Sequence, residues 1–234
     1  MENIRSCTVV DENAPEVAVD LGSHVVYKKP CVAPKVKKVS GGKFYLLVKR
    51  AVDILASLLG MLVLALPMLI IAVVIKLDSP GTVLYKQERL GKNGKPFNVL
   101  KFRSMRMDAE TAGAQWASDK DPRVTRVGEF LRKCRLDELP QLWCIFVGDM
   151  TIVGPRPERP IFYKEFGKYI DGFDQRLLVE PGLTGLAQVR GGYDLAPDEK
   201  VVYDIEYIET RSLWNDLKII FETVAIVFTH DGAR

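Results

Sequence analysis

The sequence is poor in histidine, and its cysteines show no spacing typical of a metal site. His24 and His230 are the two histidines, and each stands alone. The four cysteines form no CxxC pair and no cluster with histidine. A structural zinc site or a catalytic triad built on histidine is therefore not expected. We interpret the cysteines as reduced thiols of a cytoplasmic compartment.

Other absences narrow the class of protein further. A formal net charge of +3 on 234 residues is too small to indicate nucleic-acid binding. The aromatic residues show no repeated basic–aromatic pattern of the kind that stacks single-stranded bases. The acidic, mixed N-terminus is not followed by an apolar segment, so it does not match a secretory signal peptide. We expect no nucleic-acid partner.

Residues 1–43 lack a regular pattern as well. They contain three prolines, a basic cluster at Lys35-Val36-Lys37-Lys38 and a Ser40-Gly41-Gly42 break. No sustained helical or strand period is visible. We therefore predict a flexible polar tail that is mostly disordered or depends on a partner for order.

One long apolar run is present, from Ile54 to Ile75, and it contains no charged residue. As a helix, its roughly 22 residues would be about 33 Å long, which suits a bilayer core. Pro67 divides the run into about 13 and about 8 residues, each too short to cross a bilayer. Basic residues flank both ends: Lys43, Lys49 and Arg50 before the run, and Lys76, Lys86 and Arg89 after it.

These flanks favour a helix that enters the membrane, bends at Pro67 and leaves by the same face. The positive-inside rule assigns basic flanks to the cytoplasm, and a re-entrant helix satisfies it at both ends. A full span and a buried soluble helix are the alternatives. Proline supplies the bend because it lacks an N–H and clashes with the preceding turn. The carbonyl groups freed there need a partner, for which Ser57 or a packed helix is a candidate.

We expect a cytoplasmic α/β domain over residues 82–234, following a re-entrant segment over residues 44–81. Residues 83–87 and 97–102 are strand-like, and Asn93-Gly94 between them suits a turn with positive φ. Helices are expected over residues 127–134, 139–146, 198–211 and 215–228. The fold class is thus mainly α with a small β-hairpin, in a monotopic membrane protein.

The last predicted helix has an apolar face that permits two interpretations. It begins beside Trp214, and the face consists of Leu217, Ile220, Phe221, Val224 and Phe228. Such a helix can lie in the membrane interface, or it can close the core of the domain.

An adjacent acidic pair, Asp137-Glu138, lies among arginines. On its own the pair fits an ordinary helix start, because carboxylates are favoured at the positive end of the helix dipole. The nearby arginines are Arg132, Arg135, Arg156 and Arg159. Guanidinium groups beside acids can hold a diphosphate, and a carboxylate can hold a hard cation such as Mg²⁺. An aspartate beside bound phosphate can also act as a nucleophile.

Two turns follow the acidic pair. In Gly154-Pro155-Arg156-Pro157 the prolines restrict the backbone, so Arg156 would lose little conformational entropy on binding a ligand. Taken alone, the segment is equally consistent with an ordinary proline-rich turn. Pro181-Gly182-Leu183-Thr184-Gly185 is a second turn, whose backbone N–H groups are candidate ligand contacts.

These segments recur together, and in this order, in one known family. The matching motifs are Lys49-Arg50-Ala51-Val52-Asp53, Tyr85-Lys86-Gln87-Glu88-Arg89 with Gly91, Lys101-Phe102-Arg103-Ser104-Met105, Asp121-Pro122-Arg123-Val124-Thr125-Arg126-Val127-Gly128, Leu136-Asp137-Glu138-Leu139-Pro140-Gln141-Leu142, Gly148-Asp149-Met150, Val153-Gly154-Pro155-Arg156-Pro157, Pro181-Gly182-Leu183-Thr184-Gly185 and Ala187-Gln188-Val189. Over about residues 44–230 the chain resembles the bacterial sugar transferases, the monotopic polyprenyl-phosphate phosphoglycosyltransferases. Each motif alone is weak, whereas the ordered set is specific.

The resemblance implies a reaction and the residues that perform it. Family members transfer a phosphosugar from a nucleoside-diphosphate sugar, usually a UDP-sugar, to a polyprenyl phosphate such as undecaprenyl phosphate, and release UMP. Asp137 matches the catalytic aspartate, which would attack the β-phosphate and carry a covalent phosphosugar. Glu138 matches a glutamate expected to assist with Mg²⁺ and proton handling. Which of the two acids ligates the metal is left open.

The resemblance also assigns binding groups and a location. Lys101, Arg132 and Arg156 match basic residues that bind phosphate, and the motif Pro155-Arg156-Pro157 implicates the nucleotide end. The implied location is the bacterial cytoplasmic membrane, with the catalytic domain on its cytoplasmic face. There the reaction would initiate assembly of an exopolysaccharide, capsule, O-antigen or protein-linked glycan. The chain resembles the small catalytic-core form with an added tail.

Two positions depart from the family pattern, and several properties stay open. Leu66 precedes Pro67 where serine is frequent, and Leu186 replaces a frequent tryptophan. The sugar is not identified; residues 104–120 and 191–193 are candidate positions for its recognition. A homo-oligomer is an open alternative. The competing functions are a membrane-bound metal-dependent phosphohydrolase using the same acids and a non-catalytic scaffold of a polysaccharide assembly complex.

Overall fold

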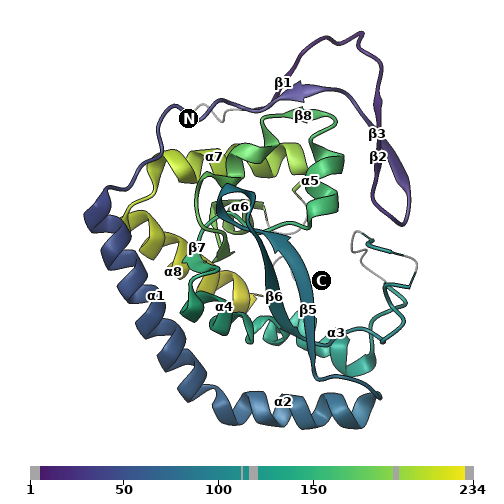
Figure 1. The fold of residues 1–234 in the computed structure, drawn as a ribbon, viewed down its shortest axis with the longest axis vertical. Coiled ribbons are helices and arrows are strands. Elements are labelled where there is room, and N and C mark those ends of the chain that lie inside the picture. The colour runs from purple at the N-terminus through teal and green to yellow at the C-terminus, as the bar shows by residue number, and fades with distance from the viewer. Residues whose placement is uncertain (1–5, 112, 116–120, 192–194, 230–234) are drawn as a thin grey trace.

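The computed structural model describes residues 6–111, 113–115, 121–191 and 195–229. Within these residues the fold is mixed α/β, and a long bent helical arm runs along one side of an α/β body (Figure 1). The helices are α1 (Lys43–Val63), α2 (Ala65–Asp78), α3 (Arg126–Lys133), α4 (Gln141–Val147), α5 (Pro160–Phe166), α6 (Leu186–Gly191), α7 (Pro197–Thr210) and α8 (Leu213–Thr229). The predicted helices over residues 127–134, 139–146, 198–211 and 215–228 correspond to α3, α4, α7 and α8.

The strands are short and fall into several small sheets. They are β1 (Thr8–Val9), β2 (Val17–Asp20), β3 (Val25–Lys28), β4 (Cys31–Val32), β5 (Leu84–Leu90), β6 (Pro96–Phe102), β7 (Thr151–Val153), β8 (Ile170–Asp171) and β9 (Gly182–Thr184). Three 3₁₀ turns, η1 (Lys92–Gly94), η2 (Leu136–Glu138) and η3 (Phe173–Leu178), complete the fold. The predicted hairpin is confirmed as β5–β6, with Leu84 opposite Phe102. Asn93 and Gly94 in its turn have φ values of 56° and 74°.

The arm consists of α1 and α2, which meet at Leu64 with a bend of 60°. Pro67 lies in the first turn of α2, where its missing N–H interrupts no bond of that helix. The carbonyl of Val63, four residues before the proline, loses its normal donor, and α1 therefore ends there. The predicted break in the apolar run is confirmed, although the hinge lies three residues before Pro67. Among the described residues no single helix meets the length and hydropathy of a bilayer span, whereas α1 and α2 together do.

Ser57 does not satisfy the carbonyl groups at the bend, so that expectation is wrong. Its hydroxyl donates to the carbonyls of Asp53 at 2.6 Å and Ile54 at 3.1 Å, one turn back along α1. The side chain is fully buried against the body. Ser57 bonds locally because a helical serine reaches the carbonyls three and four residues earlier more readily than any group ahead of it.

Two charged residues of α1 attach the arm to the body. The guanidinium of Arg50 donates to two carbonyl groups at the C-terminal end of α4, each at 2.7 Å. The last carbonyls of a helix lack the usual donors one turn ahead, although that of Ile145 also accepts from the N–H of Gly148 at 3.1 Å, and a cation is favoured at this end of the helix. Asp53 accepts hydrogen bonds from the Thr151 hydroxyl at 2.7 Å and from the Ile152 N–H at 3.0 Å. The basic and acidic residues at the start of the arm therefore have structural partners in α4 and β7.

The N-terminal segment is not without regular structure, and the prediction of a mostly disordered tail is wrong for residues 6–43. β2 and β3 form a hairpin, while β4 pairs with β1 on one side and with β8 on the other. Val19 is 1% exposed and packs with Phe162, Phe166 and Ile205. Strands of two to four residues give no sustained period, and β8 lies far along the chain from β4, so the sequence offers no local signal for this pairing.

One interpretation of helix α8, that it closes the core, is confirmed, while its role in the membrane interface stays a prediction. Ile219 is buried in a cluster with Tyr207, so one side of the helix closes the core. The predicted apolar face is largely exposed: Phe221 is 71% exposed, and Leu217 and Val224 are each 47% exposed. The side chain of Phe228 lies outside the described part of the structure.

Candidate active site

A cavity of about 760 Å³ lies in the body. It is bordered by the β5–β6 hairpin, the segment after β6, α3, η2, the loop after β7 and part of α7. Five predicted site residues line it together: Lys101, Arg132, Asp137, Glu138 and Arg156. Pro155 and Pro157 flank Arg156 in the loop after β7 and are not among the described residues that line the cavity. The structure thus brings these five charged residues together, while their catalytic and binding roles stay predictions.

The acidic pair lies in a tight turn, not in the first turn of an α-helix. Arg135 adopts a left-handed conformation with φ of 56°, and the 3₁₀ turn η2 follows directly. Pro140 then precedes Gln141, the first residue of α4. Both acids are buried, with exposures of 7% for Asp137 and 8% for Glu138. The ordinary helix-start interpretation therefore does not account for them, because an acid at an exposed helix end would be solvated.

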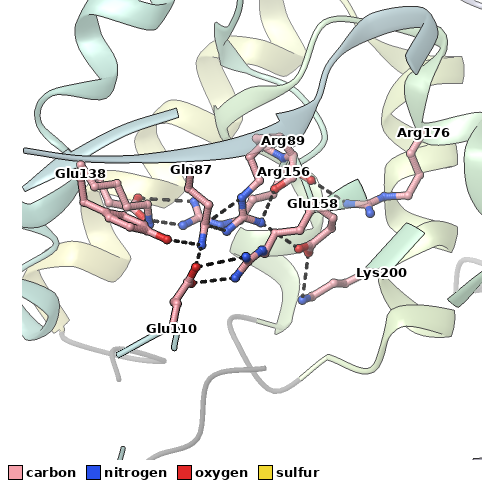
Figure 2. A network of polar contacts seen from close by, with 12 residues as sticks. Gln87, Arg89, Glu110, Glu138, Arg156, Glu158, Arg176 and Lys200 are labelled. Carbon is pink, nitrogen blue, oxygen red and sulfur yellow. Dashed lines mark hydrogen bonds and ion pairs between the residues drawn. The ribbon is translucent and has the colours of Figure 1, made fainter. Parts of the chain in front are cut away.

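Glu138 is held on both sides by cations. The Lys101 ammonium lies 2.9 Å from Oε1 of Glu138, and the Arg156 guanidinium donates to both carboxylate oxygens (Figure 2). Burial alone would raise the pKa of this carboxyl, but Arg156 and Lys101 outweigh burial and hold the pKa well below its usual value. Glu138 is consequently an ionised group whose charge is neutralised by its neighbours.

Asp137 is in a different state, although it is the adjacent residue. No described residue donates a hydrogen bond to its carboxylate. Burial raises its pKa, and the charges of Lys101, Arg132 and Arg156 oppose that rise. The carboxylate therefore lines the cavity close to three cations without being tied to any of them. Such a group is available to a ligand, whereas Glu138 is already engaged.

The arginines predicted around the acids divide into two groups. Arg132 lines the cavity and pairs with no carboxylate of the described residues. Arg159, in contrast, forms an ion pair with Glu110 at 2.8 and 3.2 Å. Arg135 contributes its left-handed backbone to the turn and also lines the cavity.

Two arginines that were not predicted as site residues fix the proline-rich loop. Arg176, which is 2% exposed, donates to the carbonyl of Arg156 at 2.9 Å. Arg89 donates to the carbonyl of Pro157 at 3.0 Å. Asp204 in turn holds Arg176 at 2.5 Å. The family motif contains Arg89, but nothing in the local sequence marks Arg176, because its partners are distant in the chain.

A chain of alternating charges extends the site beyond Arg156. Glu158 pairs with Arg89 at 3.2 Å and with Lys200 at 3.9 Å (Figure 2). Burial would raise the pKa of Glu158, but Lys200, Arg89 and Arg176 together lower it below the usual value. Burial also lowers the pKa of Lys200. Paired charges of this kind make the wall of the cavity polar without leaving isolated buried ions.

The second glycine-rich turn supports the first. Gly182 donates its N–H to the carbonyl of Pro155 at 2.9 Å, and Gly154 donates to the carbonyl of Thr184 at 2.8 Å. A Cβ at position 182 would lie 2.1 Å from the nitrogen of Gly154, so only glycine permits this backbone approach. The N–H of Gly182 is thus used within the protein, contrary to the candidate role of a ligand contact. Of the positions suggested for sugar recognition, residues 112, 116–120, 192 and 193 lie outside the described residues.

Comparison with known proteins agrees with the geometry. A family model described as bacterial sugar transferase matches residues 44–230. The chain is 45% identical over 193 residues to the UDP-N-acetylgalactosamine-undecaprenyl-phosphate N-acetylgalactosaminephosphotransferase of Aeromonas hydrophila, covering 81% of this chain and 46% of the relative. It is 42% identical over 190 residues to the UDP-glucose:undecaprenyl-phosphate glucose-1-phosphate transferase of Caulobacter vibrioides, covering 79% of this chain and 71% of the relative.

A third relative acts on another sugar. The undecaprenyl-phosphate galactose phosphotransferase of Salmonella typhimurium is 40% identical over 200 residues, covering 79% of this chain and 41% of the relative. The chain thus spans about half the length of several relatives that it matches. Since the match extends through the arm, the acidic turn and the glycine-rich turns, the chain belongs to the bacterial sugar transferase family.

Proposed function

We propose that this protein transfers a phosphosugar from a UDP-sugar to undecaprenyl phosphate and releases UMP. The single observation that carries the proposal is the state of Asp137: it is buried in the cavity, accepts no hydrogen bond from the described residues and lies in the field of three cations. Its relatives are named for this transfer with N-acetylgalactosamine, glucose and galactose. Those three names differ in the sugar, so the sugar itself is not assigned.

The proposed reaction has two steps, each a displacement at phosphorus. In the first, an oxygen of Asp137 bonds to the β-phosphorus while the bond to the bridging oxygen breaks, and UMP leaves with that electron pair. In the second, an oxygen of the lipid phosphate attacks the same phosphorus and expels the carboxylate of Asp137. A covalent intermediate lets one cavity serve both phosphates in turn.

The surrounding cations can neutralise the negative charge that develops on the phosphate oxygens during each step. Arg132 is available to phosphate oxygens, while Lys101 and Arg156 are held in place by Glu138. Prearranged cations stabilise a transferring phosphoryl group without reorganising during the step. Glu138 acts here as the residue that positions two of them.

Mg²⁺ is the expected cofactor, and the donor set is compatible with it. Among the described residues there is no group of three or more His, Cys, Asp or Glu side chains suited to a metal. Mg²⁺ commonly takes only one or two carboxylates and completes its shell with substrate phosphates and water. Because Glu138 already faces two cations, Asp137 is the acid with free oxygens to hold it. When bound, the ion would neutralise charge on the diphosphate.

We further propose that the arm is a re-entrant membrane element. Its outward side chains are apolar over both limbs: Leu47, Leu55, Leu59, Leu62, Val63, Leu66, Leu69, Ile70, Val73 and Leu77 are each more than half exposed. If the 60° bend is shared equally, each limb is inclined by about 30° to the bilayer plane. Helix α2, about 21 Å long, then descends by about 10 Å, which is less than half of a bilayer core. This depth suits a monotopic protein that meets the lipid phosphate at the cytoplasmic surface.

The topology can be tested with single-cysteine variants in a background without the four native cysteines. Lys43→Cys and Asp78→Cys lie at the two ends of the arm, and both positions are exposed. We expect an impermeant thiol reagent to reach both only from the cytoplasmic side. Labelling of Asp78→Cys from outside would replace the re-entrant arrangement with a span.

The activity is tested by following UMP release from UDP-N-acetylgalactosamine, UDP-glucose and UDP-galactose, with and without undecaprenyl phosphate. We expect sustained release only with the lipid phosphate, together with a lipid-linked phosphosugar product. Continuous release of inorganic phosphate without lipid would instead support the phosphohydrolase. A lack of turnover with all donors, combined with tolerance of changes at Asp137 and Arg156, would support the scaffold.

A further inference from the structure

The residues ahead of the family match form a strap across the body. We define the strap as residues 6–42, which precede α1. Its end nearest α1 is fastened by three backbone N–H groups: Ser40 donates to the carbonyl of Ile208 at 3.0 Å, Lys37 to Glu209 at 2.7 Å and Val36 to Gln175 at 2.7 Å. Backbone donors are used at all three points, so the attachment depends on the path of the chain more than on side-chain identity.

The middle of the strap is a strand of the body's own sheet. β4 runs parallel to β8, with Cys31 opposite Ile170. Cys31 and Ala33 are 6% and 3% exposed, so this portion is part of the core. Because main-chain bonds and buried side chains both hold it, the strap has a fixed position relative to the body.

The far part of the strap is the β2–β3 hairpin, which lies against α5. Val19 is 1% exposed and packs in the cluster that includes Phe162 and Phe166. The N–H of Asp20 donates to Glu165 at 2.9 Å. These contacts hold the last pair of the hairpin ladder, Asp20 opposite Val25, immediately before the turn.

The tip of this hairpin touches the rim segment, which we define as residues 105–111 and 113–115 at the edge of the cavity. Gly22 has φ of +80°, and a Cβ there would lie 1.9 Å from the carbonyl oxygen of Ala114 and 2.9 Å from Cα of Gln115. Figure 1 shows the β2–β3 hairpin extending toward this part of the chain. Backbone therefore meets backbone, and no side chain can enter the contact without moving one of the two segments.

The rim segment contributes directly to the cavity. Ala109, Glu110 and Gln115 are among its lining residues. Glu110 forms the ion pair with Arg159 described above and also accepts from Gln87 at 3.3 Å. Displacement of the rim would consequently alter a charged wall of the cavity, although none of these groups contacts Asp137.

We propose that the strap is a positioning element for the nucleotide-sugar donor, and that Gly22 acts through the rim segment on Glu110 and Arg159. The donor is the substrate concerned because the wall is charged and polar, which suits a water-soluble polyanion with a hydroxylated sugar and not an apolar lipid chain. The assignment of the donor rests on the proposed function, whereas the mechanical coupling of strap to rim does not.

The test compares Gly22→Ala with Gly94→Ala in the full-length chain. Both glycines have positive φ at hairpin tips, but a Cβ at position 94 meets nothing within 4 Å. Both variants therefore carry similar backbone strain, and only the first should displace the rim. For Gly22→Ala we expect KM for the UDP-sugar to rise by about tenfold with kcat nearly unchanged, because ångström-scale displacement of positioning groups costs one to two orders of magnitude. KM for undecaprenyl phosphate should stay constant.

A second readout does not depend on activity. Hydrogen exchange over residues 105–111 and 113–115 should accelerate in Gly22→Ala and stay at the native rate in Gly94→Ala. If wild-type protein turns over no UDP-sugar, the proposed function fails, and this exchange comparison still decides the coupling. Equal changes in both variants, or no change in either, would overturn the proposal.

A milder pair covers the case in which Gly22→Ala does not fold. Val19→Ala removes a buried contact of the hairpin, whereas Val25→Ala changes the same residue type at a position that is 51% exposed on the neighbouring strand. We expect Val19→Ala to raise the donor KM and the exchange of the rim by a smaller factor than Gly22→Ala, and Val25→Ala to do neither. Identical behaviour of the two valine variants would also contradict the proposal.

Discussion

The arm and the cavity depart from a typical globular protein in opposite ways. On the arm, large apolar side chains such as Leu62 and Leu77 are 68% and 83% exposed. In the cavity and its walls, charged residues such as Glu138 and Arg176 are 8% and 2% exposed. Exposed apolar surface and buried charge are the two informative exceptions to ordinary burial. Together they fit the proposed function, in which the arm contacts lipid and the cavity holds polyanionic substrates.

The two regions also differ in how they tolerate their unusual residues. The exposed apolar side chains of the arm are not covered by any of the described residues, and under the proposed re-entrant arrangement lipid would cover them. The cavity satisfies most of its own charges, because Glu138, Glu158 and Asp204 each face a cation. Among the described residues that line the cavity, Asp137 is the acid without an ion-pair partner. Substitutions that disturb one region at a time should sharpen this contrast.

Replacement of Asp137 by Asn should remove the reaction and leave the fold intact. The variant keeps the size of the side chain but loses the negative oxygen, and loss of a nucleophile commonly costs about 10⁴-fold or more in kcat. UMP release in the presence of undecaprenyl phosphate measures it. Glu138→Gln, the matched change one residue later, should retain measurable turnover. Near-native activity of Asp137→Asn would refute the nucleophile.

Removal of Arg156 should have the next largest effect. Arg156→Ala takes away a phosphate-binding cation and leaves Glu138 with Lys101 as its remaining ion-pair partner. We expect kcat/KM to fall by about 10²–10³-fold, the usual loss for one prearranged electrostatic group. Arg159→Ala serves as the comparison, because that guanidinium is paired with Glu110. An equal loss in both variants would mean that the two arginines are not distinct.

A charge on the arm should weaken membrane association without touching the cavity. Leu59 is 62% exposed on α1, and Leu59→Glu would bury a carboxylate in lipid at a cost of about 2–3 kcal/mol. Flotation with anionic phospholipid vesicles measures the partition. Val10→Glu is a matched control, since Val10 is 66% exposed but lies on the strap. Equal flotation of Leu59→Glu and native protein would argue against contact of α1 with lipid.

Breaking the attachment between the arm and the body should have a smaller effect, seen in the free energy of unfolding. Asp53→Ala leaves the Thr151 hydroxyl and the Ile152 N–H without their acceptor, and buried orphaned donors cost about 1–3 kcal/mol. Chemical denaturation in detergent should show this loss of stability. Asp78→Ala, at an exposed position near the end of α2, should be neutral. A neutral Asp53→Ala would mean that the arm is held by packing alone.

The smallest expected effect is on stability, because the buried carboxyl of Asp137 lowers the free energy of unfolding when it is ionised. Burial raises the pKa of this carboxyl above its usual value, so its ionised form destabilises the fold at neutral pH. The stabilising contribution of the protonated form is complete below the unfolded pKa and is lost as pH rises through the folded pKa. Asp137→Asn should therefore be slightly more thermostable than native protein at pH 7 and lose that advantage below about pH 4. A constant difference across pH would exclude the carboxyl as its cause.

Activity should follow the same titration with the opposite sign. The ionised carboxylate is the proposed nucleophile, so kcat should fall as pH drops through the raised pKa of Asp137. Loss of turnover should therefore begin at a higher pH than for an unperturbed aspartate.

The sequence was informative where the signal was local. The break in the apolar run near Pro67, the Asn-Gly turn and the short helix over residues 127–134 each depend on residues close together in the chain, and each was confirmed. The charged site was predictable because the ordered family motifs bring together Lys101, Asp137 and Arg156 from separate elements. Composition alone would have left the acidic pair as an ordinary helix start.

The remaining features depend on partners that are distant in the chain. Arg176 supports the Arg156 carbonyl from a turn with no motif of its own, and β4 joins β8 through two residues on each side. Short strands and single buried arginines carry too little periodicity to be recognised. The expectation for Ser57 was wrong for a different reason. Its hydroxyl bonds to carbonyls that precede it on the same helix and therefore does not reach the bend.

The attachment of Arg50 to the end of α4 gives the arm a further significance. The acidic turn η2 leads into α4 with only two residues between them, and α4 ends in the carbonyl groups that Arg50 holds. The arm and the acids are thus joined by less than three turns of helix. If the arm is re-entrant as proposed, we expect bilayer thickness to affect catalysis, because a thinner or thicker membrane that tilts α1 would raise or lower the acids relative to the plane of the lipid phosphates.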